Sequence, residues 1–141
     1  MAQRIVVDTS VLIAALISEA GPSREILRRC LIGTYQPLIS NALFWEYADV
    51  TNRDSILDLC PVSVQDVHDL RDSLCTTCEW ISIYYLWRPN LADESDNHIL
   101  ELAVAGNAEM IVSNNIRDFR DSQLTFPEID IVTPEQLLQS N

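Results

Sequence analysis

A short β-branched run, Ile5–Val7, ends at Asp8 and passes at once into apolar residues with helical spacing. This pattern predicts a buried parallel strand followed directly by a helix. The same alternation continues to the end of the chain, with residues 51–62 expected to be irregular. We expect strands at 3–7, 36–40, 80–87, 109–113 and 129–132, and helices at 10–20, 23–32, 41–50, 64–74 and 96–105, with a last helix opening at 134.

Alternating strands and helices place a parallel sheet between two layers of helices. The length of 141 residues suits one domain over residues 1–141. The sequence therefore predicts an α/β fold, a three-layer α/β/α sandwich with a central parallel sheet of four to five strands. No apolar run approaches the ~20 residues of a membrane span, and no secretory signal pattern opens the chain. We therefore expect a cytoplasmic protein without membrane contact.

Four cysteines are too few for a disulfide scaffold. Cys75 and Cys78 have the spacing of a redox or zinc pair. A zinc site would need a second pair of ligands, and Cys30 and Cys60 stand alone while His68 and His98 are far apart. The sequence therefore favours structural thiols that pack as small apolar side chains.

The charge of the chain limits how it could hold a nucleic acid. The formal net charge is −12, and all nine positive residues are arginine. An acidic chain does not bind a polyanion by bulk electrostatics, so contacts to phosphate must come from arginine, backbone amides or a metal ion. The absence of lysine argues against a phosphoacceptor receiver domain and a haloacid-dehalogenase-type phosphatase. With only three glycines there is no glycine-rich turn for a dinucleotide.

Four acids occupy related places in this predicted fold. Asp8 follows the first strand, and Glu46 lies on the helix after the second. Asp96 opens the helix before the fourth strand, and Asp118 follows that strand. The carboxyl ends of parallel strands can meet in one cleft, where clustered carboxylates would repel one another unless a cation lay between them.

Each acid also has a simpler local explanation. Asp8 could cap the helix that follows it, and Glu46 could be a solvated helix residue. The acidic stretch 93–96 favours the dipole of the helix it opens, and Ser113 and Asn115 are common turn residues. The shared location of the acids, more than any single one, favours a metal site, with Asp93 as a supporting or alternative ligand.

The chain resembles the PIN-domain nucleases over essentially its whole length. The matching segments, in this order, are VVDTSVLIAAL, LISNALFWEY, DESDNHILELAVAGNAEMIVSNNIRDF and IDIVTPEQLL. The chain also looks like the toxin components of bacterial toxin–antitoxin pairs, including VapC-like proteins. This resemblance implies a Mg²⁺- or Mn²⁺-dependent endoribonuclease that cleaves single-stranded or structured RNA, with a small antitoxin protein and a homodimer as expected partners.

The resemblance also assigns roles to individual residues. It places the catalytic and metal-binding acids at Asp8, Glu46, Asp96 and Asp118, with support from Ser10 and Asn115. Asp93 and Ser113, which adjoin these acids in the sequence, are the other expected supporting residues. Arg117 and Arg24 are the expected substrate contacts. Trp45, Tyr84 and Trp87 could stack on bases, although their apolar surroundings favour core packing.

The chain departs from the family pattern at two positions. Asn115 and Asn97 stand where many relatives have an acid. Fewer charges would weaken a second metal site, which leaves one-metal operation or low activity as the two expectations. The alternative is a catalytically weak PIN-like module that binds RNA or a protein partner without cleavage, which the net charge and Asn115 favour and the four acids oppose.

Overall fold

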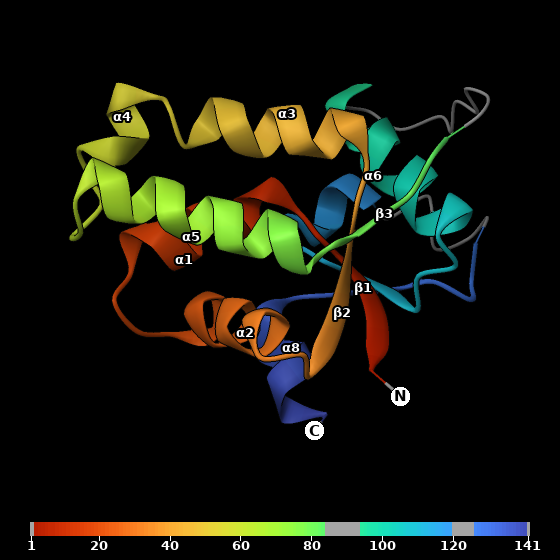
Figure 1. Cartoon of the computed structure of the whole chain (residues 1–141). Coiled ribbons are helices and arrows are strands. Elements are labelled where there is room, and N and C mark those ends of the chain that lie inside the picture. Colours follow the sequence, from red (N-terminus) through yellow and green to blue (C-terminus); the bar gives the residue numbers. More distant parts are fainter. Residues whose placement is uncertain (1, 84–93, 120–125, 141) are drawn as a thin grey trace.

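Five parallel strands form one central sheet. The computed structural model describes residues 2–83, 94–119 and 126–140, and for residues 94–97 it describes the backbone alone. The strands lie in the order β3-β2-β1-β4-β5 (Figure 1). Their bounds are β1 Gln3–Val7, β2 Tyr35–Ile39, β3 Glu79–Trp80, β4 Met110–Val112 and β5 Asp130–Val132. This confirms the predicted parallel sheet of an α/β sandwich.

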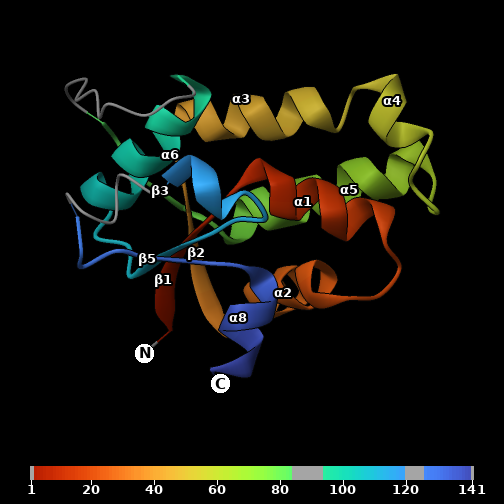
Figure 2. The ribbon, with the colours of Figure 1, turned by 180° about the vertical axis from the view of Figure 1, so that it is seen from behind.

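Helices cover both faces of the sheet. The helix α6 packs against β1, β2 and β4, whereas α2 packs against α5, α8 and β2 (Figures 1 and 2). The bounds are α1 Thr9–Ile17, α2 Pro22–Leu31, α3 Asn41–Val50, α4 Asp54–Leu57, α5 Val64–Thr77, α6 Glu94–Ala105, the 3₁₀ turn η1 Ile116–Phe119, and α8 Pro134–Gln139. The short helix α4 lies in the stretch expected to be irregular. None of the helices in the described ranges is long and apolar enough to cross a bilayer.

Local capping fixes where several helices begin. Ser40 caps α3 by accepting a hydrogen bond from the backbone N–H of Leu43 at 3.2 Å. Thr133 caps α8 within a capping box. By its residue type Ser23 would be expected to cap α2, but it does not. The helix already begins at Pro22, because proline suits the first helical position, and Ser23 is buried inside the first turn.

The third strand is much shorter than the predicted strand 80–87. It spans Glu79–Trp80 and pairs with Leu38 and Ile39 of β2. One further backbone hydrogen bond joins the N–H of Ile81 to the carbonyl of Ile39 at 2.9 Å. The partner strand then ends, because Ser40 turns away to cap α3, so residues 81–83 are not strand. Positions 84–87 of the predicted strand lie outside the described residues.

The core is continuous from the sheet into the helices that carry the candidate site. Ile5, Val6 and Val7 of β1 are almost completely buried. Tyr47 on α3 is also buried, and its hydroxyl donates to the carbonyl of Val7 at 2.5 Å. This contact ties α3 to the end of β1, one residue before Asp8. The four cysteines are free, and burial raises the pKa of Cys30 to about 12.

Candidate active site at the ends of the first and fourth strands

The candidate site lies where the sheet changes direction. The strands β1 and β4 are neighbours, but the chain after β1 leads toward β2 and the chain after β4 leads toward β5. Val7 pairs with Val112, and the backbone N–H of Asp8 donates to the carbonyl of Val112 at 3.0 Å. This register sets Asp8 beside Ser113, whose hydroxyl donates to Asp8 Oδ2 at 2.7 Å. Open parallel sheets bind ligands at such a point.

The side chain of Asp8 is buried and held by hydroxyl groups. Only 6% of the residue is exposed, and Ser10 Oγ donates to Oδ2 at 2.8 Å, beside the bond from Ser113. Asp8 occupies the capping position of α1, yet its side chain makes no capping hydrogen bond. Capping therefore explains the place of this residue but not the orientation of its carboxylate.

Burial raises the pKa of the Asp8 carboxyl above its usual value, against the opposing effect of the hydrogen bonds from Ser113 and Ser10. The nearby charge of Glu46 raises this pKa further. The carboxylate of Glu46 therefore lies close enough to the end of β1 to act on Asp8. A group that has lost its water and faces a second negative charge is stabilised by a bound cation.

Both oxygens of Glu46 have donors from other elements. Thr9 Oγ1, at the start of α1, donates to Glu46 Oε1. His98 Nε2, on α6, lies 2.6 Å from Glu46 Oε2. A carboxylate can only accept, so Nε2 carries the proton and donates it. Glu46 is therefore oriented from two sides and differs from the freely solvated helix residue that its sequence context suggests.

His98 is a site residue that the sequence analysis missed. It is partly buried, and its Nδ1 is buried without a hydrogen-bond partner in the described residues. The contact between His98 and Glu46 spans 52 positions of the chain. No spacing rule connects residues so far apart. The only sequence signal was a histidine two positions after Asp96, on a helix already predicted to carry a ligand.

The remaining predicted residues lie around this pair. The backbone N–H of Asn115 donates to Ser113 Oγ at 2.9 Å, while the residue itself is exposed. Asp118 is exposed on η1, one turn beyond the end of β4. Asp96 lies in the first turn of α6, where the backbone alone is described, and Asp93 lies outside the described residues. Within the described ranges, no three His, Cys, Asp or Glu side chains are arranged to hold a metal ion.

The donors that are described nevertheless fit a magnesium-type ion. Asp8 and Glu46 offer hard carboxylate oxygens. Magnesium commonly binds through one or two carboxylates, keeps several waters and takes substrate phosphate as a further ligand. The raised pKa of Asp8 is the observation in favour of a cation here. The first turn of α6, with Asp96, lies two residues before His98 and so adjoins the same place.

Most arginines are already neutralised by acids. Five of the seven described arginines have a carboxylate partner. Arg24 and Arg117 are the two that have no acidic partner in the part of the chain that the structure describes. Arg24 Nε donates to the carbonyl of Ser18, and Arg117 is exposed beside Asp118. These are also the two arginines that the sequence analysis selected as substrate contacts.

Comparison with known families agrees with this geometry. A sequence model of the PIN domain matches residues 4–117, which include Asp8, Glu46 and Asp96 and end one residue before Asp118. The match covers well over half of the chain, so the chain belongs to the PIN domain family. PIN domains are generally nucleases, which makes a hydrolase of phosphodiesters the expected class of activity. No curated protein matches the chain.

Proposed function

We propose that this PIN domain is a divalent-metal-dependent endoribonuclease. The observation that carries the proposal is the buried Asp8, hydrogen-bonded to Ser113 across the switch point of the sheet and raised in pKa by burial and by the charge of Glu46. Mg²⁺ or Mn²⁺ would be held by Asp8 and Glu46. Asp96 and Asp118 stay predictions as further ligands.

The residues around the site would either orient the metal-binding carboxylates or contact the RNA. A bound divalent ion supplies a Lewis acid for the phosphodiester and lowers the pKa of a water. Ser10 and Ser113 fix the carboxylate of Asp8, and Thr9 and His98 fix that of Glu46. Such orienting groups matter because a ligand set acts only when its geometry is preserved. Arg24 and Arg117, which have no acidic partner in the described residues, would contact phosphate.

Removal of the metal is the direct test of this proposal. We expect Mg²⁺ or Mn²⁺ to support cleavage of single-stranded RNA, EDTA to abolish it, and excess Mn²⁺ to restore it. Binding to the folded state alone also stabilises it, by about 2.7 kcal/mol at a metal concentration 100 times the dissociation constant. The melting temperature should therefore rise with added metal. Cleavage that continues in EDTA would contradict the proposal.

The hydrogen bond from His98 to Glu46 gives a second prediction. His98→Leu should lower cleavage by about 10- to 100-fold, because loss of a group that orients a ligand typically has an effect of this size. His98→Gln keeps an N–H near the position of Nε2 and should retain most of the activity. Initial rates and melting temperatures of the two variants are the measurements. Equal losses in both variants, with unchanged folding, would argue against an orienting role.

The alternative is a module that binds RNA without cleaving it. The specific observation in its favour is that no group of three potential metal ligands forms within the described ranges. RNA binding by wild type with no cleavage in Mg²⁺ or Mn²⁺, across several RNAs, would establish this alternative. The toxin role, the antitoxin partner, the homodimer and the cytoplasmic location stay predictions from the resemblance and the composition.

A further inference from the structure

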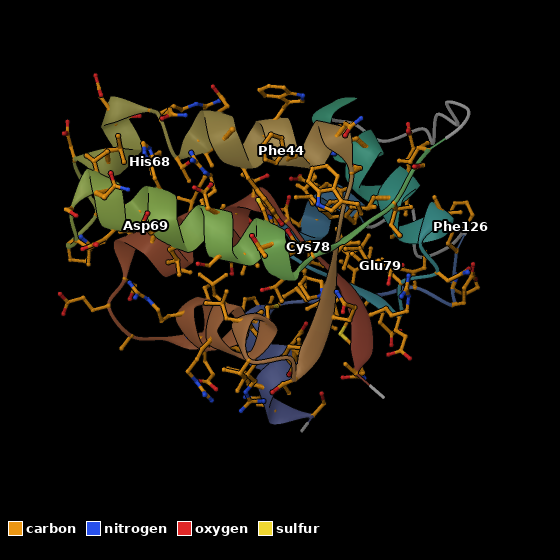
Figure 3. The ribbon with its side chains drawn as sticks, in the orientation of Figure 1. Phe44, His68, Asp69, Cys78, Glu79 and Phe126 are labelled. Atoms are coloured by element: carbon orange, nitrogen blue, oxygen red, sulfur yellow. The ribbon has the colours of Figure 1, made fainter. Side chains whose placement is uncertain are left out.

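The surface next to Glu46 is rich in exposed aromatic rings. Trp45 on α3 is 68% exposed and Trp80 on β3 is 50% exposed. Phe44 joins them, with its ring centre 5.4 Å from that of Trp45 and 5.5 Å from that of Trp80. Figure 3 shows Phe44 on α3, on the side of the molecule where Cys78 and Glu79 lead into β3. Large exposed rings of this kind can stack on the flat faces of bases.

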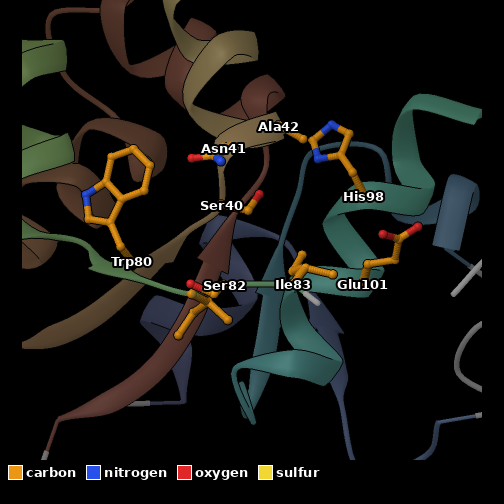
Figure 4. A pocket seen from close by; sticks show the side chains of 9 residues that line it. Ser40, Asn41, Ala42, Trp80, Ser82, Ile83, His98 and Glu101 are labelled. Carbon is orange, nitrogen blue, oxygen red and sulfur yellow. The ribbon is translucent and has the colours of Figure 1, made fainter. Parts of the chain in front are cut away.

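A pocket of about 350 Å³ opens beside these rings. Figure 4 shows Trp80 at one end of it and His98 and Glu101 at the other. The groups between them that can form hydrogen bonds are Ser40, Asn41 and Ser82. A volume near the lower limit of ordinary ligand sites, with one aromatic wall and several polar groups, suits one planar polar molecule.

The pocket shares a wall with the candidate active site. His98 lines the pocket, and the same imidazole donates through Nε2 to Glu46 at 2.6 Å. Its Nδ1 is buried without a hydrogen-bond partner in the described residues. A ligand in the pocket would therefore lie next to a molecule or ion held by Glu46.

The charge distribution indicates what such a ligand must offer. The net charge of −12 repels a polyanion, and five of the seven described arginines are paired with acids. Contacts to phosphate can therefore supply only a small part of the affinity for RNA. Base stacking does not depend on net charge and is worth about 1–3 kcal/mol per base.

We propose that this pocket receives one unpaired nucleobase of the RNA substrate, with the indole of Trp80 stacked on it. The base would belong to a nucleotide next to the phosphodiester that the acids address, so this inference rests on the ribonuclease function proposed above. A base inside a helix is paired and stacked and cannot enter a pocket, whereas bases in loops and single strands can. The substrate is therefore single-stranded at this position.

Binding of a fluorescein-labelled single-stranded RNA, measured by anisotropy in the Asp8→Asn background, separates this inference from catalysis. Adding Trp80→Ala should weaken binding by about 5- to 150-fold, the range that the loss of one stacked base implies. Trp80→Phe should restore most of the affinity. Ala42→Leu, which fills the pocket from α3, should weaken binding without removing the indole. Leu59→Ala, an exposed apolar residue outside the pocket, is the matched control and should bind like its parent.

The outcomes distinguish the two proposals. In the active protein, Trp80→Ala should raise KM for single-stranded RNA more than it lowers kcat. Equal affinity of the Trp80→Ala and parent proteins, with normal cleavage by wild type, would overturn the pocket and leave the nuclease intact. Equal affinity for duplex and single-stranded RNA would overturn it as well. Binding that depends on Trp80, without metal-dependent cleavage by wild type, would support the pocket and overturn the nuclease.

Discussion

Asp8→Asn is expected to reduce RNA cleavage by more than about 100-fold, beyond the usual effect of losing a group that only orients a ligand. The variant should still fold, because the asparagine oxygen can accept the hydrogen bonds from Ser10 and Ser113 that the carboxylate accepts now. It should also melt at a higher temperature than wild type in the absence of metal. Burial makes the ionised carboxyl unfavourable, and asparagine carries no charge that must lose its water.

The pH dependence of this stability difference follows from the direction of the pKa change. The pKa of Asp8 is higher in the folded protein than in the unfolded chain, so the folded state holds the proton more tightly. This contribution to wild-type stability is therefore fully present below the unfolded pKa, is lost as the pH rises through the folded pKa, and does not change further at higher pH. The advantage of Asp8→Asn should be largest at neutral pH and should narrow in acid. Thermal denaturation at several pH values measures it.

Asp58→Asn is the matched control, because Asp58 is an exposed acid at the end of α4. It removes the same charge but should change neither the cleavage rate nor the response to added metal. Cleavage by Asp8→Asn at the wild-type rate would remove the chemical role assigned to this carboxylate. A fall in its melting temperature would show that burial of the charge is not the dominant effect at this position.

The sequence was sufficient to predict the part of the site that lies at the ends of β1 and β4. Apolar runs that end at Asp8 and Ser113 predict two buried strands, and parallel strands deliver their carboxyl ends to one edge. The meeting of Asp8 with Ser113 then follows from the register of β1 with β4. The prediction that Glu46 lies near Asp8 rested on its place on the helix after the second strand and on the family resemblance, since the helix period places a residue on a face but does not say what that face meets.

The sequence could not predict the part of the site that depends on packing between helices. His98 reaches Glu46 because α6 packs against α3, and neither helix carries a pattern that specifies this pairing. The apolar surroundings of Trp45 favoured packing in the core, but its side chain is largely exposed. Its neighbours Leu43 and Tyr47 fill the buried face of α3, and Trp45, two positions from each of them, lies on the opposite face of the helix. Tyr84 and Trp87 lie outside the described residues.

Gly106→Ala is expected to be the most destabilising of the small substitutions near the site. Gly106 follows α6, and a methyl group there would lie 2.6 Å from Leu38 Cδ1, 3.2 Å from Ile81 Cγ1 and 3.2 Å from the carbonyl oxygen of Leu102. Leu38 is completely buried and cannot swing aside. Overpacking of this kind typically costs about 1–3 kcal/mol. At about 2–4 °C per kcal/mol, the melting temperature should fall by several degrees.

A double-variant cycle with Leu38 identifies the cause of that loss. If the new methyl group collides with Leu38, then Leu38→Ala should relieve part of the strain. The loss of stability in the double variant should then be smaller than the sum of the two single losses by about 0.5–3 kcal/mol. Strict additivity would show that the collision is not the cause. The carbonyl of Gly106 also accepts hydrogen bonds from Arg4 at 2.8 and 3.0 Å, so it ties the end of α6 to β1. A displaced α6 would carry His98 away from Glu46, and RNA cleavage by Gly106→Ala should therefore fall even at temperatures where the variant remains folded.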